Sequence, residues 1–212
     1  ALVCAGALDF GDAIKIVRAR GAYMQQAVPV GEGAMAAILG LADDVIIGAC
    51  DTAREDGIVD AVNFNAPGQV VIAGSAAAVD RAIAICKEAG AKRALPLPVS
   101  APFHSSLMKP AADRLAERLD AMVFEPPTIP VLNNIDVAAP QDPQAIKAAL
   151  VRQAFGPVRW VEIIQSLSAN GVTKIIECGT GKVLTGMAKR IEPSLVAVPV
   201  YDPASLTDAM AA

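Results

Sequence analysis

The chain has 212 residues, a formal net charge of −4 and 54% hydrophobic residues. This length suits one larger domain or two small ones, and the acidic balance argues against nucleic acid as a partner. No apolar run approaches the roughly 18 uninterrupted residues that a membrane span needs, so we expect no membrane association.

The first predicted helix follows Asp9, which has the composition of an N-cap, and runs to about Gln26. Its apolar stripe is expected to pass through Ile14, Val17 and Met24. The preceding letters ALVCAG are typical of the interior of a buried helix that begins upstream. We therefore expect the chain to be a portion of a longer protein.

A compact series of short elements follows the first helix. Strands are predicted at 34–39, 57–64, 69–73 and 93–97, and helices at 43–54 and 75–89. The order strand, helix, strand, strand, helix, strand is the ferredoxin-like pattern. Residues 33–97 are therefore predicted to form a small βαββαβ subdomain.

The remaining sequence alternates between helices and strands. Helices are predicted at 110–122, 143–153, 161–169 and 182–190, and buried strands at 131–133, 174–178 and 195–200. This alternation favours a parallel sheet, but the strands are too few to complete one. Residues 1–32 and 98–212 are therefore expected to form an α/β core that is incomplete at its N-terminus.

The single histidine, His104, lies in a loop between two predicted elements, where functional residues often gather. A general base there would need a nucleophile on one ring nitrogen and an orienting acceptor on the other. A surface or core role is the competing interpretation. Arg20, beside the apolar stripe of the first helix, is either a solvated arginine or a guanidinium that grips a carboxylate.

Cofactor and metal signals are weak. One histidine makes a structural zinc site improbable, and no GxGxxG motif supports a dinucleotide site. The GTGK at 179–182 departs from the phosphate-loop pattern and is better explained as a tight turn between a strand and a helix. Four cysteines without a CxxC pair indicate free thiols and a reducing, cytoplasmic setting.

Several blocks, in order, carry a resemblance that covers essentially the whole chain. They are ALVCAG, RGAYMQQAVP, GEGAMAAI, VNFNAPGQVVIAG, AGAKRALPLPVSAPFHSSLMKPA, PVLNNIDV, ALVRQ with GPVRW, and GKVLTGM. With these blocks the chain resembles the malonyl-CoA:acyl carrier protein transacylases of bacterial fatty-acid synthesis. The resemblance implies an α/β-hydrolase-like core with a ferredoxin-like insert. It also implies transfer of a malonyl group from malonyl-CoA to the phosphopantetheine thiol of acyl carrier protein, through a serine ester and without a cofactor or metal.

The resemblance also implies roles for individual residues. His104 would be the general base and acid, and Gln153 would orient its ring through the backbone carbonyl. Arg20 would bind the free malonyl carboxylate, and Phe103 would favour malonyl over methylmalonyl groups.

A second group of residues is implied in substrate binding. Asn63, Asn65 and Gln69 match a segment that contacts CoA, although stabilising a turn is an equal alternative for Asn65. Met24 would line the acyl pocket together with Met35, although core packing explains both methionines better.

One family motif is absent from these 212 residues, the GHSxGE elbow that carries the nucleophile. In the family it precedes the ALVCAG block, so the serine is expected about half a dozen residues ahead of Ala1. The chain by itself is therefore expected to be inactive. The alternatives are a non-catalytic fragment that binds CoA or carrier protein, and a serine hydrolase of related fold.

Overall fold

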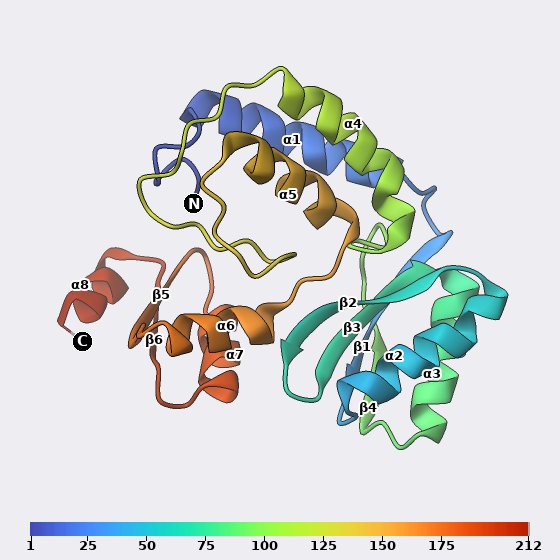
Figure 1. The fold of residues 1–212 in the computed structure, drawn as a ribbon. Coiled ribbons are helices and arrows are strands. Elements are labelled where there is room, and N and C mark those ends of the chain that lie inside the picture. The colour runs from blue at the N-terminus through green and yellow to red at the C-terminus, as the bar shows by residue number, and fades with distance from the viewer. Residues whose placement is uncertain (212) are drawn as a thin grey trace.

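The computed structural model describes residues 1–211 (Figure 1). Its α-helices are α1 (Phe10–Gln26), α2 (Asp43–Ala53), α3 (Ala76–Glu88), α4 (Lys109–Asp120), α5 (Pro143–Phe155), α6 (Trp160–Ala169), α7 (Val183–Ile191) and α8 (Pro203–Ala211). Two 3₁₀ helices are η1 (Arg54–Asp56) and η2 (Ser106–Met108). The strands are β1 (Gly33–Leu39), β2 (Val59–Ala66), β3 (Gln69–Ser75), β4 (Arg93–Pro96), β5 (Lys174–Cys178) and β6 (Val196–Val200).

The predicted βαββαβ order is confirmed. Strands β1 to β4 form one antiparallel sheet in the order β2-β3-β1-β4, and α2 and α3 cover one face of it (Figure 1). Between sheet and helices lies a dry core in which Ile38, Ile46 and Ile72 are fully buried. Each such side chain contributes about 1.5–3 kcal/mol by leaving water, so this unit has a substantial core of its own.

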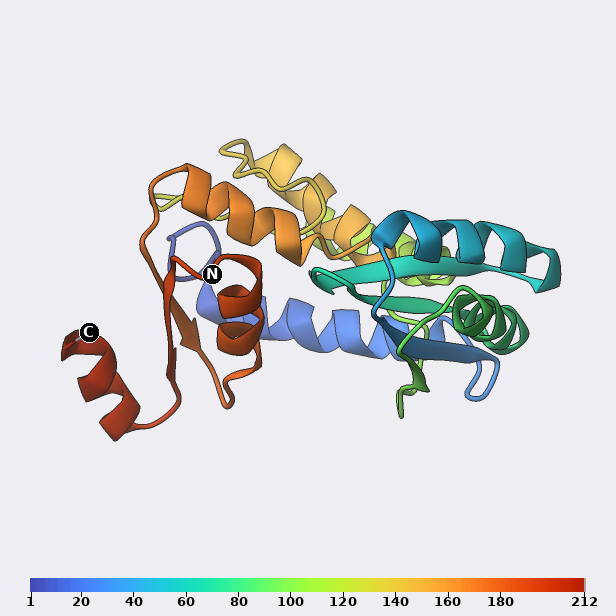
Figure 2. The same cartoon turned by 90° about the horizontal axis from the view of Figure 1, so that it is seen from below.

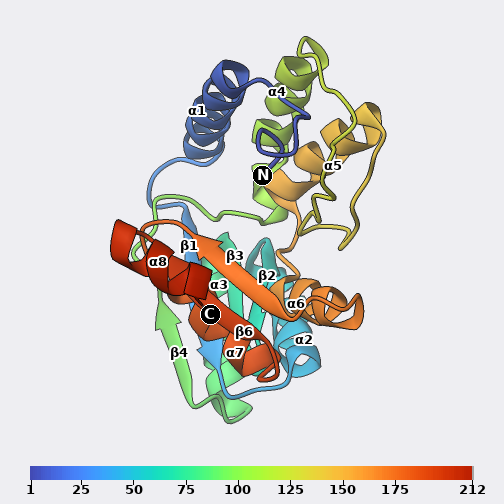
Figure 3. The ribbon, with the colours of Figure 1, turned by 90° about the vertical axis from the view of Figure 1, so that its left-hand side faces the viewer.

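Helices α1, α4 and α5 lie together beyond one end of the sheet, above it in Figure 3, and α4 packs against both α1 and α5. The predicted stripe of α1 was wrong in two places, because Ile14 is 54% and Val17 68% exposed. The buried face instead passes through Ile16 and Met24. These two residues and Arg20 are spaced four apart, which places all three close to one side of a 3.6-residue helix.

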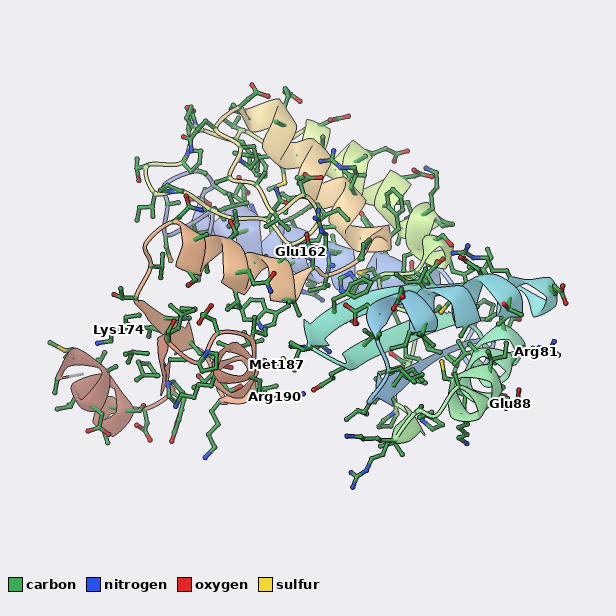
Figure 4. All side chains as sticks on the ribbon, turned by 60° about the horizontal axis from the view of Figure 1, so that its bottom comes forward. Arg81, Glu88, Glu162, Lys174, Met187 and Arg190 are labelled. Atoms are coloured by element: carbon green, nitrogen blue, oxygen red, sulfur yellow. The ribbon has the colours of Figure 1, made fainter. Side chains whose placement is uncertain are left out.

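The C-terminal part of the chain contains the parallel strands β5 and β6, as the helix–strand alternation predicted. Helices α6, α7 and α8 lie around this pair (Figure 2). The side chain of Lys174, labelled in Figure 4, donates to the carbonyl of Ala209 in α8 at 2.6 Å. This contact fixes the last helix against the strand pair.

For this part of the chain one prediction was wrong, and one helix was not predicted. The segment 131–133 is irregular, because within residues 1–211 no neighbouring strand pairs with it. Helix α8 was not predicted, although Pro203 suits a first helical turn and the Asp202 carboxylate accepts from the Ser205 N–H at 2.7 Å. Across residues 1–211, the helices are all too short or too polar to span a bilayer.

Two contacts join the loop that carries His104 to the ferredoxin-like sheet and to α1. A Cβ on Gly33, at the start of β1, would stand 2.4 Å from the Pro102 ring, so only glycine permits this approach. The Ser100 hydroxyl donates to the side chain of Gln25 in α1 at 2.6 Å. The loop is thus held between α1 and the sheet.

Candidate functional site

The His104 loop connects β4 with η2 and α4. The backbone of His104 has φ +66°, in the left-handed region that few side chains adopt. Such backbone strain persists only where the surrounding structure holds it in place. The loop therefore aims the imidazole in a direction that extended or helical backbone would not give.

One ring nitrogen of His104 has a fixed partner. Its Nδ1 lies 3.0 Å from the backbone oxygen of Gln153 in the last turn of α5. That carbonyl is free to accept because the residue four positions on is Pro157, which has no N–H. With Nδ1–H donating to the carbonyl, Nε2 has the lone pair and is free to accept a proton.

The surroundings keep the His104 ring neutral. Burial lowers the pKa of His104, the backbone carbonyl of Gln153 opposes this effect, and the positive charge of Arg20 lowers the pKa again. The net direction is downward from the usual histidine range. At neutral pH the ring is therefore a base ready to accept a proton.

Arg20 lies beside this ring on the buried side of α1. Its Nε is buried and, among the described residues, has no hydrogen-bond partner. Burial lowers the pKa of the guanidinium, which nevertheless stays charged because arginine does not lose its proton in proteins. An unpartnered buried donor on a cation is costly, so this position suits an anionic ligand.

Two adjoining cavities share His104 and Arg20. One, of about 420 Å³, is also lined by Gln153 and Asn134. The other, of about 400 Å³, is also lined by Met24, Met35, Asn63 and Phe103. A base and a guanidinium in one hollow can activate a hydroxyl or thiol while holding a carboxylate.

Not all predicted site residues come together. Asn65 and Gln69 are not among the described residues that line these two cavities. Gln69, at the start of β3, instead accepts from Arg190 of α7 at 2.6 Å, on the side of α7 toward the sheet (Figure 4). Met24 is only 2% exposed and packs in a small apolar cluster beneath Phe103, so it belongs to the core as well as to the cavity wall.

Two contacts that support the site were not predicted. The side-chain amide of Gln153 donates to Oδ1 of Asn134. Ser106, two residues after the histidine, bonds to Asp60 of β2. Both contacts join segments far apart in the sequence, so no local sequence pattern predicts them. Within residues 1–211 we find no cluster of three or more His, Cys, Asp or Glu that could hold a metal ion.

The comparisons with known proteins agree with this geometry. Residues 1–192 match the family model described as acyl transferase domain. The chain is 58% identical, over 97% of its length and 66% of the relative's, to the malonyl CoA-acyl carrier protein transacylase of Haemophilus influenzae. It thus spans about two thirds of the length of such relatives.

Solved structures show the same likeness. The acyl-carrier-protein S-malonyltransferase of Burkholderia pseudomallei is 60% identical, with a TM-score of 0.98 over 100% of this chain and 69% of that one. A second match is a chain in a solved complex described as a type II PKS acyl-carrier protein with its malonyl-transacylase. The TM-score is 0.97 and the identity 53%, over 100% of this chain and 68% of that one. The expected α/β class is confirmed by these likenesses.

Proposed function

The chain belongs to the acyl transferase domain family. From this premise we propose that it functions in a malonyl-CoA:acyl carrier protein transacylase, with His104 as the general base. The observation that carries the proposal is the presence in one hollow of an imidazole oriented by the Gln153 carbonyl and a guanidinium whose buried Nε has no partner among the described residues. Malonyl groups offer what these two residues suit: a thioester to be attacked and a free carboxylate to be held.

In the proposed reaction, Nε2 of His104 takes the proton of a serine hydroxyl as that oxygen attacks the malonyl thioester. The carbon–sulfur bond breaks, and His104 returns the proton to the leaving CoA sulfur. In the second half, the pantetheine thiol of acyl carrier protein gives its proton to His104 and attacks the serine ester. Serine leaves with the proton, and malonyl remains on the carrier thiol. These 212 residues contain no GHSxGE motif, so the serine is not identified among them.

Gln153 supports this cycle with a carbonyl where a usual triad has a carboxylate. A neutral acceptor fixes the tautomer of the ring but stabilises the imidazolium less than an aspartate does. Arg20 would bind the malonyl carboxylate with its planar fork, and Phe103 would narrow the same hollow against a branched acyl group. Asn63 lies in the cavity wall where the CoA arm would pass, while Asn65 and Gln69 are assigned to CoA only by resemblance.

The proposal includes malonyl-CoA and acyl carrier protein as partners and needs no cofactor. Support for a carrier-protein partner comes from the related malonyl-transacylase whose structure includes one. We place the reaction in the cytoplasm, since Cys4, Cys50, Cys86 and Cys178 are all free thiols, as a reducing compartment would keep them.

The test is malonyl transfer by the protein expressed from its complete coding sequence. With radiolabelled malonyl-CoA and holo acyl carrier protein, wild type should label the carrier protein, and His104→Ala should lose at least about a thousandfold in kcat. Asp113→Ala, which breaks an exposed ion pair with Lys109 on α4, is the control and should match wild type. Free malonate as the main product would indicate a hydrolase instead, and wild-type transfer by His104→Ala would remove the proposal.

A further inference from the structure

The carboxylate of Asp60 ties the His104 loop to the ferredoxin-like sheet by two hydrogen bonds. Ser106 donates its backbone N–H and its hydroxyl to the same oxygen of Asp60, Oδ2, each at 2.8 Å. Asp60 lies on β2, where it pairs with Ala73 of β3, and it precedes Ser106 by 46 residues. Its side chain is only 23% exposed. The contact therefore joins the two halves of the molecule two residues from the imidazole.

The second oxygen of Asp60 is also occupied. Arg54, in η1, donates to Oδ1 at 3.0 Å and also pairs with Asp51 on α2. Arg54, whose side chain is 52% exposed, thus bridges the carboxylates of Asp60 and Asp51. The Asp60 carboxylate is thus held with one oxygen toward Arg54 and the other toward the loop.

This clamp acts on the backbone around His104. Ser106 begins η2, where a helical N–H has no acceptor in its own helix, and Asp60 supplies one. A second contact spans the histidine. The carbonyl of Pro102 accepts both from the Ser105 N–H at 3.3 Å and from the fully buried Ser105 hydroxyl at 2.6 Å. His104 stands between these fixed points in its left-handed conformation.

We propose that Asp60, held by Arg54, is a positioning residue that keeps the imidazole of His104 aimed at the reacting hydroxyl or thiol. This inference rests on the proposed function. Asp60 acts on the ring through Ser106, because both hydrogen bonds of its Oδ2 to the loop come from Ser106. Its strand also contributes Asn63 to the cavity wall, so β2 connects the substrate hollow with the catalytic loop.

The experiment compares graded variants in the protein expressed from its complete coding sequence. Asp60→Ala removes both bonds to Ser106, Ser106→Ala removes one, and Ser106→Thr keeps both. Asp113→Ala, an exposed ion-pair partner on α4, is the matched control. The measurements are kcat and KM for malonyl-CoA, together with the pH dependence of diethyl pyrocarbonate modification, read on the tryptic peptide 94–114 that contains His104.

We expect Asp60→Ala to lower kcat by about ten- to a hundredfold, because misplacing a catalytic group by an ångström has effects of this size. Its KM for malonyl-CoA should change little. Its His104 should react faster with diethyl pyrocarbonate, and the pH midpoint of that modification should rise toward that of free histidine as burial is lost. Ser106→Ala should lose about two- to tenfold, while Ser106→Thr and Asp113→Ala should match wild type.

Two results would overturn the inference. One is wild-type kcat in folded Asp60→Ala and Ser106→Ala. The other is a loss of kcat that is matched by lost thermal stability, with the His104 titration unchanged, because that pattern belongs to a merely structural contact. If wild type transfers no malonyl, the proposed function fails, and the His104 titration alone then decides whether Asp60 positions the ring.

Discussion

Replacing Arg20 with alanine tests whether the hollow beside His104 selects for a carboxylate. Arg20 lies on the buried side of α1, and its Nε has no partner among the described residues. A malonyl carboxylate would supply the missing acceptor, and Arg20→Ala leaves that carboxylate unpaired. Acetyl-CoA, which has no such carboxylate, should lose nothing from the substitution.

The size of the effect follows from the half-buried position of the side chain. Hydrogen bonds to charged groups contribute about 1.5–3 kcal/mol each, and partial solvent screening reduces the sum for a two-pronged contact. We therefore expect a loss of about 2–3 kcal/mol in transition-state binding, which is roughly 30- to 140-fold in kcat/KM for malonyl-CoA. The preference for malonyl-CoA over acetyl-CoA should fall by the same factor.

The assay is transfer from each of the two CoA esters to acyl carrier protein by the protein expressed from its complete coding sequence. Arg18→Ala is the matched control, because Arg18 is an exposed arginine on the same helix. Arg20→Lys should recover only part of the preference, since an ammonium keeps the charge but not the fork. Unchanged selectivity in Arg20→Ala would refute the reasoning and remove Arg20 from the site.

Two further predictions concern pH and packing. In the pH profile of kcat/KM, the midpoint of the acid limb should lie below the usual histidine pKa range, because the reaction needs neutral His104 and burial lowers the pKa of His104. A midpoint at or above that range would contradict the assigned environment. Gly33→Ala should lower stability by about 1–3 kcal/mol in thermal melts, because its Cβ would stand 2.4 Å from Pro102. Gly48→Ala, on α2 with nothing within 4 Å of the added Cβ, should instead raise stability by about 0.5–1 kcal/mol, and equal effects of the two changes would count against the close approach.

Local signals in the sequence were enough to predict most of the fold. Turn residues and capping residues separate the elements between 33 and 97, and their order alone predicts the sheet topology. The prediction of a strand at 131–133 was wrong because a run of apolar residues indicates only an extended or buried segment, whereas a strand also needs a neighbouring strand to pair with. The stripe of α1 was misplaced because Ile14 and Val17 are apolar yet exposed, and apolar residue type does not require burial.

The site was predictable in part, and chiefly through the resemblance. His104 stood out as the single imidazole in a loop, and the Gln153 carbonyl was expected from a family block. Arg20 could also have been placed from periodicity, since it stands four residues from both Ile16 and Met24. The bond from Ser106 to Asp60 could not, because it depends on how two distant segments fold onto each other.

The most direct test is the rate at which the protein from the complete coding sequence becomes malonylated when mixed with malonyl-CoA alone. Rapid quenching followed by intact-mass analysis measures this first half-reaction without acyl carrier protein. Wild type should gain one malonyl group on a serine within milliseconds to seconds, and His104→Ala should do so orders of magnitude more slowly. Equal malonylation rates in the two proteins would contradict the role given to the imidazole.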